Sequence, residues 1–211
     1  AWTYAHELGR LHLEQTFPEE VTTECYENLT QDLAEKAIYE AIRKDCNIIF
    51  TTTPEFVKAS VQAAIDHPNV KILNCSLNTS HRYIRTYYAR MYEAKFLMGA
   101  VAGAMSENGQ LAYIADYPIF GTIANINAFA LGAKMINPRA RVYLEWSTLK
   151  DVDIRLAMEN VQKKGVTVVS GKDMVIPEDA SRYFGLYHLT EEGPHNLAMP
   201  LWHWGKFYEQ L

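Results

Sequence analysis

The stretch MYEAKFLMGAVAGAMSENGQLAYIADYPIFGTIANINAFALGAKMINP, residues 91–138, decides the fold. Apolar residues recur every three or four positions over residues 91–105, which predicts a helix. A turn signal at 107–109 precedes an apolar run at 111–115 that predicts a buried strand. A second helix begins near Gly121 or Thr122. This order indicates that the chain passes here from one α/β lobe into another.

Two glycines of the first predicted helix, Gly99 and Gly103, lie one turn apart. Such spacing lets a neighbouring backbone come close, either in a soluble core or between membrane helices. A membrane span needs about 20 apolar residues. Glu93 and Lys95 interrupt the apolar run, so we expect close packing in a soluble core.

Polar and aromatic residues follow the predicted strand at 111–115. Asp116 and Tyr117 come directly after it, and Asn125 and Asn127 fall in the first turns of the next helix. Open α/β sheets bind ligands beyond the carboxyl ends of their strands, where helix N-termini also present free N–H groups. This pattern predicts a ligand-binding mouth. The aromatic ring could equally pack in the core, and the asparagines could cap the helix.

Strands and helices alternate along the rest of the chain, which predicts parallel sheets with right-handed crossovers. We expect an α/β fold with a first lobe at 1–90, a second at 91–190 and a return segment at 191–211. Further strands are predicted at 21–26, 46–50, 70–75, 83–88, 141–146, 166–170 and 183–188. Further helices are predicted at 2–16, 30–43, 55–66, 151–164 and from 203 to the end.

The composition excludes several classes of protein. The 211 residues are 48% hydrophobic and 21% charged, with a net charge of −5 and no basic tract, which argues against nucleic acid as a partner. Three cysteines without a C-x-x-C motif predict buried free thiols rather than disulfides or a metal site. His6-Glu7 begins like the zinc motif H-E-x-x-H, but Arg10 stands where the second histidine would be.

The usual motifs of nucleotide binding and hydrolysis are missing from the sequence. It contains no G-x-G-x-x-G, no G-x-x-x-x-G-K-[ST] and no G-x-S-x-G. Lys172 and Asp173 follow a predicted strand and could form an active pair or a solvated turn. A binding protein needs only a pocket with a few fixed polar groups, so we expect no enzyme, no metal and no cofactor.

The stretch and its surroundings resemble the BMP (basic membrane protein) family of ABC-transporter substrate-binding lipoproteins, which includes purine-nucleoside receptors. The likeness is carried by residues 92–99, the turn at Gly109, the strand 111–115 and residues 129–133. It implies a type I periplasmic-binding-protein fold of two Rossmann-like lobes that close on a ligand. It also implies that the family's first strand would precede Ala1.

The resemblance implies ligand-binding positions one by one. A stacking aromatic falls on Trp2 and its neighbour on Thr3, and a carboxylate at a strand end falls on Asn74 or, with a shift, on Ser76. A second stacking position falls near Asn125. The glycine-rich turn falls at Gly171, a ribose-binding aspartate at Tyr187, and a lysine near Trp202, so that amide and aromatic groups replace the family's acids and its lysine. The residues expected to bind ligand are Trp2, Thr3, Asn74, Asp116, Tyr117, Asn125, Asn127, Gly171, Lys172, Asp173, Tyr187 and Trp202.

The function expected from this resemblance is that of an extracytoplasmic, lipid-anchored receptor. It would bind a planar polar small molecule such as a nucleoside and deliver it to an ABC permease. A non-transport sensor on the same fold is an alternative, and an enzyme acting on nucleosides would require clustered carboxylates. A missing first strand would leave an unpaired sheet edge, which a homodimer or a domain swap could fill.

Overall fold

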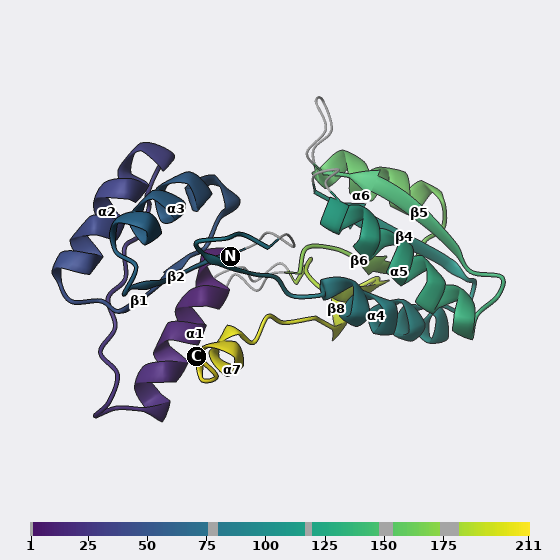
Figure 1. Cartoon of the computed structure of the whole chain (residues 1–211). Coiled ribbons are helices and arrows are strands. Elements are labelled where there is room, and N and C mark those ends of the chain that lie inside the picture. The colour runs from purple at the N-terminus through teal and green to yellow at the C-terminus, as the bar shows by residue number, and fades with distance from the viewer. Residues whose placement is uncertain (1, 76–79, 117–119, 148–153, 174–181) are drawn as a thin grey trace. The chain divides into compact units, whose positions relative to one another are not determined.

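The computed structural model describes residues 2–75, 80–116, 120–147, 154–173 and 182–211 of the chain (Figure 1). The chain divides into two compact units. The first unit comprises residues 2–89 with 202–211, and the second comprises residues 90–201. Each unit contains one sheet with helices packed against it.

The first unit is built on a three-stranded parallel sheet in the order β1-β2-β3. Successive residues of β2 point to opposite faces, as a strand requires. Ile72 therefore packs under α2 and α3, whereas Leu73 packs under α1 and α7 beside Trp204. The elements of this unit are α1 (Trp2–Thr16), α2 (Gln31–Arg43), β1 (Ile48–Thr51), η1 (Pro54–Phe56), α3 (Val57–Asp66), β2 (Lys71–Cys75), β3 (Arg85–Tyr87) and α7 (Trp204–Tyr208).

The second unit is built on a five-stranded sheet in the order β5-β4-β6-β7-β8. The core strand β4 is buried on both faces: Leu111 and Tyr113 pack with α4 and α5, and Ala112 and Ile114 pack with α6. The elements of this unit are α4 (Met91–Met105), β4 (Gln110–Ala115), α5 (Phe120–Ile136), β5 (Arg141–Trp146), α6 (Ile154–Lys163), β6 (Val168–Ser170), β7 (Leu186–Thr190) and β8 (Gly193–Ala198).

The glycines of α4 and α5 bring the two helices into backbone contact. A methyl group added at Gly99 would collide with the backbone of Phe129, and one added at Gly132 would collide with that of Phe96. At Gly103 the added carbon would lie 2.6 Å from the carbonyl oxygen of Ala133. The predicted close packing at Gly99 and Gly103 is confirmed. In the described part of the chain, no helix has the length and apolar character needed to cross a membrane.

The predicted α/β fold with parallel strands is confirmed, but one strand of the second unit, β7, runs the other way. β7 pairs antiparallel with β6 and with β8. The short turn between β7 and β8 makes the second pair a hairpin. The strand predicted at 21–26 does not form: the segment holds β-branched residues, yet it pairs with no strand in the described chain. The prediction that all three cysteines are buried is wrong, since Cys25 is exposed and Cys46 is half-buried.

Candidate functional site

The carboxyl ends of three parallel strands meet at one edge of the second unit's sheet. β4 pairs parallel with β5, with Ala115 opposite Trp146, and parallel with β6, with Tyr113 opposite Ser170. The residues that follow these strands therefore share one edge, where open α/β sheets bind ligands. Asp116 and the turn 171–173 lie there.

A buried ion pair lies at this edge. Lys95 of α4 is completely buried, and its Nζ atom forms an ion pair with Asp173. The same atom donates a hydrogen bond of 3.2 Å to the Ser170 hydroxyl and lies 5.0 Å from the centre of the Tyr113 ring. The Asp173 side chain remains 14% exposed. The pair therefore links the interior of the unit to the edge of its sheet.

Burial governs the charges of this pair. Burial lowers the pKa of Lys95, and the attraction of Asp173 opposes this change. Burial likewise raises the pKa of Asp173, Lys95 opposes the rise, and the second carboxylate, Asp116, adds to it. The pKa of Tyr113 is also raised, by burial first and then by both carboxylates. Lys95 is thus the one group of this cluster that favours the ionised form of Asp173.

The neighbouring loops are held by short hydrogen bonds. The Ser147 hydroxyl donates to Asp116 at 2.9 Å, and the Ser147 N–H donates to the Ala115 carbonyl at 2.8 Å. After β6, the Gly171 N–H donates to the Gly185 carbonyl at 2.8 Å. The Gly185 N–H donates in turn to the Lys172 carbonyl at 2.6 Å. These bonds fix the backbone that carries the two carboxylates.

The first unit also carries a polar group at the carboxyl end of a parallel strand. Asn74 near the end of β2 is completely buried, opposite Thr51 of β1. Its amide N–H₂ donates to the Thr51 hydroxyl and to the Thr53 carbonyl, each at 2.8 Å. The Thr53 carbonyl can only accept, so the amide nitrogen must face it. The amide oxygen of Asn74 then has no partner within the described residues.

The other sequence-predicted residues of the first unit lie at varied positions. Trp2 is the first residue of α1, and Thr3 follows it as an exposed residue of the same helix. Trp202 is half-buried against the cluster of Trp204 and Tyr208. Neither Thr3 nor Trp202 takes part in the hydrogen bonds of Asn74.

The remaining predicted residues belong to the second unit. Asn125 of α5 has a buried amide oxygen without a partner among the described residues, and Asn127 on the same helix is exposed. Lys172 is exposed, while Gly171 packs against the ring of Tyr187. Tyr187 is 1% exposed and its hydroxyl donates to the Met158 sulfur at 3.4 Å, so this ring is part of the core. The prediction for Tyr117 falls outside the described residues.

Sequence analysis missed Lys95 as a residue of this site, although a signal was present. Lys95 lies four residues after Met91 and three before Met98, which places it on the buried face of α4. A lysine on an apolar helix face requires a buried partner. Its partner, Asp173, lies 78 residues further along the chain, so no local pattern connects the two.

The fold and these polar edges agree with a family comparison. A model of the Bmp family, described as ABC transporter substrate-binding protein PnrA-like, matches residues 1–176. The chain belongs to this family. Its members are substrate-binding proteins of ABC transporters rather than enzymes, and the resemblance noted from residues 92–133 is confirmed.

Two curated relatives of this Bmp family chain have names that state a ligand. A purine-binding protein of Brucella abortus is 32% identical over 146 residues, which are 69% of this chain and 42% of that protein. A protein of Haloferax volcanii, provisionally named as an ABC transporter glucose-binding protein, is 25% identical over 217 residues, 98% of this chain and 55% of that protein. The chain thus spans about half the length of these relatives.

Solved structures show the same fold. An ABC transporter solute-binding protein from Conexibacter woesei superposes with a TM-score of 0.67 at 14% identity, covering 81% of this chain and 58% of the other. A transcriptional activator of the comK gene from Bacillus halodurans also reaches 0.67, at 21% identity, covering 81% and 59%. The periplasmic-binding-protein-like fold therefore occurs in proteins with different roles.

Proposed function

We propose that this protein is an extracytoplasmic receptor that binds a planar polar molecule of the purine or nucleoside type and delivers it to an ABC permease. The observation that carries the proposal is the buried amide oxygen of Asn74, an acceptor without a described partner at the carboxyl end of a parallel strand. A buried acceptor left unpaired costs about 1–3 kcal/mol, so an N–H or O–H group of a ligand would stabilise it. The purine-binding relative supports this ligand class.

The predicted site residues take distinct roles in this proposal. Trp2, Tyr117 and Trp202 supply aromatic faces for stacking, as a planar base would require. Asn125, Asn127, Lys172 and the backbone at Gly171 supply hydrogen bonds, Asp116 orients its loop, and Thr3 lies beside Trp2 at the wall. Ligand binding closes the two lobes, and the closed form docks on the permease. A lipid anchor holds the full-length protein at the outer face of the membrane.

A thermal-shift screen with adenine, adenosine, guanosine, inosine and glucose tests the proposal. A purine at about a hundred times its Kd adds roughly 2.7 kcal/mol of stability. We expect a purine or nucleoside to stabilise the protein and Trp2→Ala to abolish the effect. Tyr4→Ala, which removes a 40% exposed ring from the same helix, is the matched control and leaves the effect intact. Stabilisation by glucose alone would discard the purine class, and no stabilisation by any compound would refute the proposal.

A second candidate function is ligand sensing without transport. It is favoured by the solved transcriptional activator that shares the fold, and by a metabotropic glutamate receptor-like protein of Dictyostelium discoideum that is 28% identical over 120 residues, 54% of this chain and 15% of that protein. Uptake of labelled adenosine by cells with and without the gene separates the two functions. A transport receptor is required for uptake, whereas a sensor leaves uptake unchanged.

A further inference from the structure

Lys95 is an unusual residue in the second unit, because its charged group is completely enclosed on the inner face of an apolar helix. Removing an ammonium group from water costs several kcal/mol unless a partner compensates for the lost hydration. Asp173, the Ser170 hydroxyl and the Tyr113 ring surround Nζ and supply that compensation. Methionine or leucine would fill the same space at this position without a charge, so the presence of a charge calls for an explanation.

The two oxygen atoms of Asp173 have different surroundings. Oδ1 accepts the hydrogen bond from Lys95, while no side chain among the described residues donates to the second oxygen. An ionised carboxylate can accept through both oxygens. The side chain also keeps 14% of its surface exposed at the carboxyl edge of the sheet. One oxygen is therefore anchored from inside the unit, and the other is available to a donor from outside.

We propose that Asp173 is the ligand-contacting acceptor of the second unit, and that Lys95 is a positioning residue that holds it in place and ionised. This inference rests on the proposed function, because it assigns a role within the same receptor site. It names the ligand chemistry: the bound molecule presents an N–H or O–H donor to the second oxygen of Asp173. The fixed backbone of Gly171 and Lys172 keeps this acceptor in one position.

The charges around Asp173 make the role of Lys95 testable by pH. Among the described residues, three groups face the carboxylate from the elements packed around it: Lys95 from α4, Tyr113 from β4, and Asp116 beyond the end of β4. Burial and Asp116 both raise the pKa of Asp173, and Lys95 alone lowers it. Without Lys95, Asp173 takes up a proton at higher pH and its acceptor character is lost earlier as the pH falls.

The experiment measures adenosine affinity by calorimetry between pH 5.5 and 8.5 for the wild type, Lys95→Met, Asp173→Asn and the double variant. We expect a flat pH profile for the wild type, and a loss of about tenfold or more from pH 8 to pH 6 for Lys95→Met. Asp173→Asn and the double variant bind weakly at every pH. Lys164→Met is the matched control, because Lys164 also pairs with a carboxylate, Glu145 at 2.7 Å, and lies 5.1 Å from a tyrosine ring, but at the surface.

Several results would overturn the inference. Adenosine affinity at wild-type level in the double variant would show that Asp173 does not contact the ligand, and this variant retains no unpaired buried charge that could prevent folding. If the adenosine affinity of Lys95→Met equals that of the wild type and does not change with pH, Lys95 has no positioning role. If the wild type binds none of the purines and nucleosides of the thermal-shift screen, the proposed function and the ligand contact fail together. Carbon-13 NMR titration of the Asp173 carboxyl without ligand then tests separately whether Lys95 lowers the pKa of Asp173. An unchanged pKa of Asp173 in Lys95→Met refutes this effect of Lys95.

Discussion

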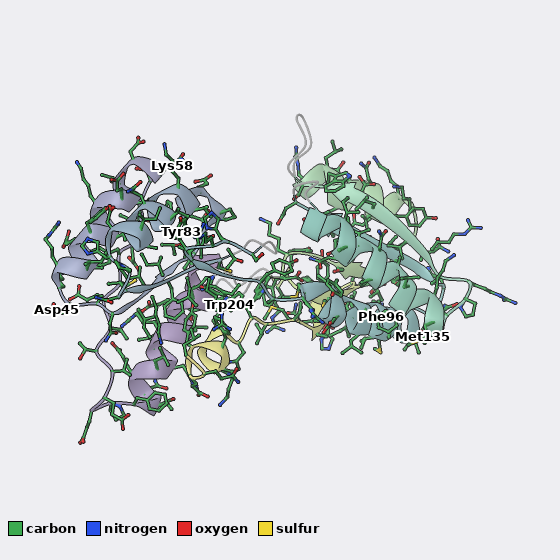
Figure 2. The ribbon with its side chains drawn as sticks, viewed as in Figure 1. Asp45, Lys58, Tyr83, Phe96, Met135 and Trp204 are labelled. Carbon is green, nitrogen blue, oxygen red and sulfur yellow. The ribbon has the colours of Figure 1, made fainter. Side chains whose placement is uncertain are left out.

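His6 on α1 predicts that the protein loses stability when the pH falls from 7 to 4. Its ring is 6% exposed and stacks on Trp204 at 4.8 Å between ring centres, and its Nδ1 lies 2.6 Å from the hydroxyl of Tyr208. The Tyr87 ring contacts it edge-on at 6.2 Å. Trp204 lies on α7, which packs against α1 (Figure 2). A protonated imidazole would lose its hydration in this aromatic cluster.

The size of the effect follows from the pKa of His6. Burial lowers it from 6.5 to about 4. Between these two values the unfolded chain binds the proton and the folded protein does not, so protonation favours unfolding. The stability contribution is complete above pH 6.5 and is lost as the pH falls toward 4. One pH unit of difference corresponds to about 1.4 kcal/mol, so the loss reaches about 2 kcal/mol at pH 5 and about 3 kcal/mol at pH 4.

Urea unfolding followed by circular dichroism, at pH 7.5, 6, 5 and 4, measures this loss. Carboxylates also titrate in this range, so the relevant quantity is the difference between the wild type and His6→Phe, which keeps an aromatic ring and cannot be protonated. We expect the wild type to lose about 2–3 kcal/mol relative to His6→Phe across the series. A constant difference between the two proteins at all four pH values would refute the argument from burial.

The remaining predictions concern packing and polar order. Gly132→Ala should lower the free energy of unfolding by about 3 kcal/mol or more and Gly103→Ala by less, because the added carbon meets backbone more severely at Gly132; urea unfolding ranks them, and the reverse order would contradict the packing argument. Asn74→Asp should destabilise the first unit by about 1–3 kcal/mol, since a carboxylate would place an acceptor 2.8 Å from the Thr53 carbonyl; unchanged stability at pH 7 would show that the amide orientation is not required.

The helix pair α4–α5 shows which parts of the fold could be predicted from the sequence. Its apolar period, its glycine spacing and the strand between the helices are local patterns, and the structure follows them closely. The backbone of Phe96 on α4, a residue labelled in Figure 2, lies against Gly132 of α5. The segment 21–26 shows the limit: a strand requires a partner elsewhere in the chain, and residue preferences alone carry no information about that partner.

The candidate site was predictable in outline for the same reason. Strand ends could be located from the sequence, so Asp116 and Asp173 were expected at sheet edges, and the family resemblance placed Asn74 at a third strand end. Their partners could not be located, because hydrogen bonds and ion pairs connect residues far apart in the chain. Asn74 bonds across 21 and 23 residues, and Asp173 pairs across 78.

The contacts of Asn74 give a physical reason for an amide rather than a carboxylate at this strand end. A carboxylate has no N–H to offer the Thr53 carbonyl, whereas the amide satisfies this acceptor and still presents its own oxygen. In the second unit the acceptor is a carboxylate instead of an amide. Asp173 forms an ion pair with Lys95, which offsets the cost of burying the charge. Each edge therefore presents a fixed acceptor, and each is stabilised by a different compensating partner.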